Sequence, residues 1–92
     1  MGVSQVQVVS LGAGGFEVVE TRPVVLTSVC VAERTGSARA VAVITDYDGA
    51  VVYLQISVPA AGSAAWADRV ALPLGCAVMS VAGSVAVTVA FE

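Results

Sequence analysis

Few side chains in this sequence could act as acids, bases or nucleophiles. The 92 residues include four Arg and seven carboxylates, but no His and no Lys. A serine nucleophile needs a neighbouring base, and Schiff-base chemistry needs a lysine amine. A carboxylate pair assembled by the fold, as in a glycosidase, is the one enzymatic arrangement left open. We therefore expect a protein that is not an enzyme. The carboxylates spaced as strand-end or turn residues are Glu17, Glu20, Glu33 and Glu92.

Two glycine-containing segments resemble parts of ligand-binding loops. Residues 46–49, Asp-Tyr-Asp-Gly, begin like a calcium loop. Such a loop closes with a Glu at its twelfth position, where this chain has Ser57. Residues 11–15, Leu-Gly-Ala-Gly-Gly, lack the Lys-Ser/Thr ending of a phosphate-binding loop. A tight turn explains Asp48 and Gly49 without a metal ion, so we expect no metal and no cofactor.

The two cysteines, Cys30 and Cys76, lie 46 residues apart and have neither CxxC spacing nor an accompanying His. A metal site is therefore not indicated. A disulfide would form only if the fold brought the two residues together. Because the N-terminal residues lack the features of an export signal, we expect two small buried thiols that are not paired.

The remaining candidates are residues for contact with other molecules. Trp66 and Tyr53 could stack on a sugar, or Trp66 could fill the core or an interface. The four Arg are expected at interfaces or sheet edges, where they can pair with carboxylates. The candidate interface residues are Val3, Val6, Val8, Phe16, Arg22, Tyr53 and Trp66.

Charge and hydropathy exclude further classes of function. The formal net charge is −3 and the Arg residues are scattered, which argues against nucleic-acid binding. Residues 49–67 and 70–91 contain no charged residue and approach the length of a membrane span. Both contain Pro, Gly and Ser, and their Val and Thr favour strands over helices. We expect neither a membrane segment nor passage through a membrane.

Alternation of apolar and polar residues along almost the whole chain predicts strands. In residues 24–33, Val25, Val29 and Val31 are expected on one face, and Leu26, Cys30 and Ala32 on the other. Asp48-Gly49 predicts a two-residue type I′ turn in a hairpin over residues 39–58. A polar break is expected at Asp68-Arg69, and a final hairpin around Ala82-Gly83. The fold class is therefore all-β, an antiparallel β-sandwich or jelly roll of about seven or eight short strands. Residues 16–92 form this domain, and residues 1–15 are an N-terminal arm or weak strand with a Gly-rich connection.

The faces expected to point outward are rich in small apolar residues. The pairs Ala40 and Ala42, Ala86 and Ala90, and Val51 and Tyr53 all lie opposite a better-filled apolar face. No strand carries the Lys that commonly blunts an exposed edge. Because monomeric proteins rarely expose large apolar patches, we expect a homo-oligomer or a larger assembly.

The order of these features over residues 24–91 resembles the small β-sandwich virion proteins of tailed bacteriophages, of the capsid decoration (cement) or head-fibre type. The stretch ends in a Pro-Ala-Ala-Gly-Ser loop, Leu72-Pro73-Leu74-Gly75 and a Val-Ala-Val-Thr-Val strand. The resemblance implies an accessory protein, often a trimer, made in the host cytoplasm and bound to the major capsid protein on the virion surface. The scarcity of charge departs from that group. The alternative is a phage tail or fibre module, or a carbohydrate-binding β-sandwich.

Overall fold

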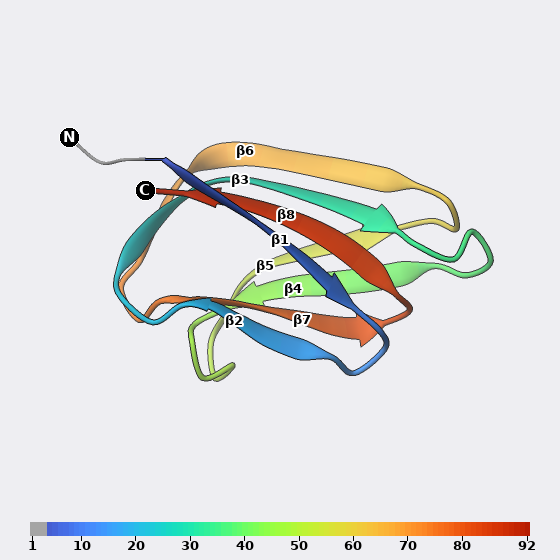
Figure 1. Ribbon diagram of the computed structural model, residues 1–92, viewed down its shortest axis with the longest axis horizontal. Coiled ribbons are helices and arrows are strands. Elements are labelled where there is room, and N and C mark those ends of the chain that lie inside the picture. Colours follow the sequence, from blue (N-terminus) through green and yellow to red (C-terminus); the bar gives the residue numbers. More distant parts are fainter. Residues whose placement is uncertain (1–3) are drawn as a thin grey trace.

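The computed structural model describes residues 4–92 and shows eight strands and no helix in that part of the chain (Figure 1). The prediction of an all-β fold is confirmed. Candidate residue Val3 lies outside the described residues. The strands are β1 (Gln5–Leu11), β2 (Phe16–Glu20), β3 (Val24–Glu33), β4 (Ala40–Thr45), β5 (Val52–Val58), β6 (Ser63–Leu72), β7 (Cys76–Ala82) and β8 (Val85–Phe91).

The strands form two antiparallel four-stranded sheets that pack into a sandwich. Sheet A has the order β1-β8-β3-β6, and sheet B has the order β2-β7-β4-β5. The first strand therefore pairs with the last, the second with the seventh, the third with the sixth and the fourth with the fifth. A long hairpin rolled into two layers has this pairing, so the fold is a jelly roll.

Strict alternation along the strands places the core between the sheets. In β8, Val85, Val87, Val89 and Phe91 are buried, whereas the residues between them point outward. Full burial of a Val or Leu side chain contributes about 1.5–3 kcal/mol. The core of the sandwich is completed by residues from the other strands, which include Val9, Leu26, Val29, Val31, Ile44, Val58, Leu72 and Val78.

The hairpin of β4 and β5 is confirmed, but its predicted turn type is wrong. The backbone N–H of Asp46 donates to the carbonyl of Val51, and that of Gly49 donates to the carbonyl of Asp46. Gly49 has a φ of +81°, whereas Asp48 is not among the residues with positive φ. A type I′ turn needs positive φ at both central residues. A longer loop, residues 46–51, therefore replaces the two-residue turn.

The expected final hairpin is wrong, because β7 and β8 belong to different sheets. Gly83, with a φ of +72°, lies where the chain crosses from sheet B to sheet A. The expected break at Asp68-Arg69 is also wrong, because β6 runs through both residues. β6 is an edge strand with a register shift opposite Thr27, and both charged residues are exposed. An edge strand keeps such side chains in water, so they need not interrupt it.

Three predicted face assignments are wrong. Tyr53, predicted to point outward, is half-buried and packs against the core. Leu26 points inward with Val29, because the ladders of β3 shift register between Leu26 and Ser28 and the alternation changes phase there. Ala40 and Ala42 are buried and face sheet A rather than solvent. Ala86 and Ala90 do point outward, as predicted.

The N-terminal segment forms a regular strand over residues 5–11, paired with β8 along its whole length. Val9 and Leu11 from this strand are buried in the core. Of the two alternatives for residues 1–15, an arm or a weak strand, the described part takes the strand form. The backbone N–H of Gly14 donates to the carbonyl of Ser80, which fixes the corner between β1 and β2.

Candidate functional site

The outer face of sheet A carries a patch of small uncharged side chains that spans all four strands, with the Arg69–Glu92 ion pair near one end. The register aligns it in three rows across the four strands, so that Val8, Thr88, Cys30 and Ala65 follow one another. We call this surface the smooth face. Its residues are Val6, Val8, Ser10, Ala86, Thr88, Ala90, Ser28, Cys30, Ala32, Ser63, Ala65 and Ala67.

No residue of the smooth face is charged, none is larger than Val, and none is fully buried. The alternation that fills the core causes this pattern, which is clearest in β8, where Ala86, Thr88 and Ala90 each lie between buried residues. The outer faces of solvated antiparallel sheets are normally polar. An apolar surface of this kind suits contact with another macromolecule, and it carries no carboxylate or guanidinium group.

The outer face of sheet B is different, because the loop of residues 46–51 lies over one end of it. The backbone N–H of Tyr47 donates to the carbonyl of Leu74, 3.0 Å away. Thr45 and Ala77, on the outer side of the sheet, are fully buried. The strands of sheet B also expose apolar side chains, and sheet A differs in that its outward side chains are small. The exposed apolar residues of sheet B are Phe16, Val18, Val52 and Val81.

The carboxylate of Asp46 holds this loop in place. It accepts hydrogen bonds from the backbone N–H groups of Ala50, at 2.8 Å, and Val51, at 3.3 Å. Burial acts to raise the pKa of the Asp46 carboxyl, but the hydrogen bonds outweigh it and leave the pKa below its ordinary value. Asp46 therefore has a structural role in the turn.

The predicted interface residues do not form one surface. Val6 and Val8 are 67% and 63% exposed and belong to the smooth face. Phe16, which is 41% exposed, lies on sheet B opposite Met79. Arg22 lies in the turn between β2 and β3, where its Nη2 pairs with Oε1 of Glu20 at 2.8 Å.

Tyr53 and Trp66 are half-buried and pack against the core. Trp66 lies on β6 opposite Val29, which is fully buried. Tyr53 lies on β5, in the other sheet. Sugar stacking needs a free aromatic face, and neither ring is fully exposed.

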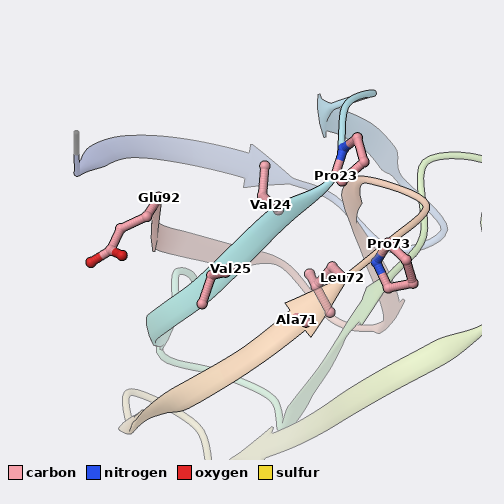
Figure 2. Close-up of a pocket in the computed structure, with 7 residues that line it drawn as sticks. All are labelled: Pro23, Val24, Val25, Ala71, Leu72, Pro73 and Glu92. Carbon is pink, nitrogen blue, oxygen red and sulfur yellow. The ribbon is translucent and has the colours of Figure 1, made fainter. Parts of the chain in front are cut away.

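A shallow apolar groove of about 300 Å³ opens at the end of sheet A, between β3 and β6 (Figure 2). Its one charged residue, Glu92, points its carboxylate away from Leu72 and Pro73. That carboxylate is held by the guanidinium of Arg69 at 2.9 and 3.1 Å. The groove could receive an apolar side chain, and the one carboxylate in its lining is already paired with Arg69. It is lined by Pro23, Val24, Val25, Ala71, Leu72, Pro73 and Glu92.

Two further carboxylates, those of Glu33 and Glu20, hold loops. The Glu33 side chain accepts hydrogen bonds from the N–H groups of Ala61, Thr35 and Gly36 and from the Thr35 hydroxyl, and these lower its pKa to about 2. Side-chain and backbone hydrogen bonds from Arg22 lower the pKa of Glu20 to about 2. Within residues 4–92, no three His, Cys, Asp or Glu side chains cluster as metal ligands would.

The two cysteines lie in contrasting environments. Both are free, as predicted, and Cys76 is buried, which raises its pKa to about 11. Cys30 is exposed at the centre of the smooth face, so its predicted burial is wrong. Cys30, Thr88 and Ala65 lie together in the middle row of the smooth face, and none of them was among the predicted interface residues. The alternation in β8 could have identified Thr88, but only the strand order shows that Cys30 and Ala65 lie beside it.

No protein-family model, curated protein or solved structure matches this chain. In the part of the chain that the structure describes, no helix has the length and apolar character to span a membrane.

Proposed function

We propose that this chain is a non-enzymatic structural subunit of a tailed-phage virion, a capsid decoration (cement) protein. In this proposal it lies on the capsid surface as a homo-oligomer and contacts the major capsid protein through the smooth face. The observation that carries the proposal is that this face is uncharged and built from side chains no larger than Val.

The energetics of such a surface support a stabilising role. Covering apolar side chains removes them from water at about 25 cal/mol per Å². A subunit that binds the closed shell more tightly than free capsid protein shifts the equilibrium toward the shell by mass action. Jelly rolls occur in capsid proteins and also in lectins, so the proposal rests on the surface and not on the fold.

Co-sedimentation with capsid shells that lack the chain tests the proposal. The shells come from the phage that encodes it, and the bound fraction is measured against concentration. We expect saturation at a fixed ratio to the capsid protein. Wild-type chain that stays in the supernatant at every concentration would overturn the proposal.

A pair of matched variants tests the surface. Ala65→Glu places a carboxylate on the smooth face, and Ala82→Glu places one on an exposed residue of sheet B. Burying an unpaired charge is costly, so A65E should bind at least about tenfold more weakly than A82E. Equal binding by the two variants would exclude the smooth face as the contact.

A further inference from the structure

The sandwich has four edge strands, and β1 differs from the other three. β2 carries Glu17 and Glu20 and has a register shift against β7. β6 carries Asp68 and Arg69 and has a register shift against β3. β5 is uncharged, but its ladder with β4 shifts near Tyr53. Charges and bulges are the features that keep sheet edges from pairing with other chains.

β1 has neither of these protections. Its seven residues pair with β8 without a register shift, and none is charged. Within residues 4–92, β8 is its one strand neighbour (Figure 1). Its other side therefore presents backbone N–H and C=O groups to solvent, next to the exposed side chains of Val6 and Val8.

We propose that β1 pairs antiparallel with β1 of a second copy of this chain across a twofold axis. In such a pairing each strand meets its own sequence, so a charged strand would bring like charges together. β1 contains no charge and satisfies this condition. The two copies of sheet A then form one eight-stranded sheet.

The area of the smooth face indicates how this pairing would strengthen binding to a partner. At about 4.8 Å per strand and 3.3 Å per residue, three rows two residues apart on four strands cover roughly 380 Å². A stable interface takes about 800 Å² from each partner. Two smooth faces side by side supply about 760 Å², so the dimer comes close to the area that one copy lacks. This use of the doubled face rests on the proposed function, but the strand pairing does not.

Mass in solution tests the pairing on the purified chain alone. We expect light scattering behind a sizing column to show a dimer, twice 9.2 kDa, that dissociates on dilution. Val8→Lys places like charges at the paired edge and should weaken dimerisation at least tenfold. Val52→Lys is the matched control, because Val52 is 57% exposed and lies on the edge strand β5.

Several outcomes would overturn the pairing: a monomer at all concentrations, a trimer, or a dimer that V52K disrupts and V8K leaves intact. Circular dichroism checks that both variants keep the β fold, and Val6→Lys replaces V8K if that variant unfolds. Loss of capsid binding by a wild-type dimer would instead overturn the proposed function and leave the pairing in place.

Cross-linking at Cys30 separates edge pairing from face-to-face association. β3 is the third strand from the proposed axis, so the two Cys30 residues lie about 24 Å apart, five strand spacings. A short bis-maleimide should therefore not link them. In face-to-face association the sheets lie about 10 Å apart, and efficient linking through Cys30 would contradict the edge pairing.

Discussion

The carboxylate of Glu33 accepts a hydrogen bond of 2.9 Å from the backbone N–H of Ala61, 28 residues further along the chain. Glu33 ends β3, and Ala61 lies in the loop between β5 and β6 with a φ of +57°. The same carboxylate accepts hydrogen bonds from Thr35 and Gly36 in the next turn. One ionised side chain thus holds two loops together at one end of the sandwich.

This arrangement makes folding stability depend on pH. The pKa of Glu33 falls from an ordinary 4.5 to about 2, because the backbone N–H of Ala61 and the other donors favour the ionised form. A lowered pKa gives stability that is fully present above pH 4.5 and is lost as the pH falls toward 2. Urea unfolding at pH 7, 4.5, 3 and 2 should show this loss. Glu33→Gln should make the free energy of unfolding fall less steeply with decreasing pH. An equally steep loss in E33Q would contradict the role of Glu33.

Gly83 should tolerate no side chain. Its φ is +72°, and a Cβ there would lie 2.7 Å from the carbonyl oxygen of Arg39. Gly36 is the matched control, because its φ is +74° but no atom lies within 4 Å of an added Cβ. Backbone strain alone costs about 1–2 kcal/mol. We expect Gly36→Ala to lose about that much stability and Gly83→Ala clearly more, by urea unfolding. Equal losses would show that the chain relaxes around Arg39.

Leu26 should be a strong contributor to the core. It is 1% exposed and lies on β3 between Val70 and Phe91 of the neighbouring strands. Leu26→Ala is expected to lower the free energy of unfolding by about 2–5 kcal/mol. Val81→Ala, at a site 58% exposed, should change it by no more than about 0.5 kcal/mol. A small effect of L26A would mean that the sheets pack less closely than described.

The two thiols should react at very different rates. Cys30 is exposed, whereas burial shields Cys76 and raises its pKa to about 11, so little thiolate forms at pH 8. A thiol reagent should label one cysteine per folded chain and two in denaturant. Cys30→Ser should remove the rapid phase, and rapid labelling of that variant would contradict the burial of Cys76.

Most of the strands could be predicted because they carry their own alternation, whereas the charged pair Asp68-Arg69 divided the prediction for β6. The bounds of residues 24–33 match β3, and the buried face of β8 is visible in its spacing. Which sheet a strand joins depends on contacts far along the chain. The turn at Ala82-Gly83 indicates only that the chain reverses, and the crossing from sheet B to sheet A cannot be read from it.

The candidate site was predicted less well, because it too depends on the order of the strands in the sheet. Small outward residues such as Ala86 and Ala90 are visible in the sequence, but their continuity with Cys30 and Ala65 depends on strand order. The bulge at Thr27 also moved Leu26 to the inner face, because one extra residue reverses the alternation. Tyr53 and Trp66 were predicted as contact residues because they are large and aromatic, but both pack against the core.

The thermal stability of capsid shells with and without the chain tests the central claim most directly. Calorimetry would compare bare shells, shells saturated with wild-type chain, and shells mixed with the same concentration of A65E. We predict that the wild type raises the melting temperature of the shell, by an amount that stops increasing at a fixed binding ratio, and that A65E does not. An unchanged melting temperature at saturation with the wild type would contradict a stabilising role.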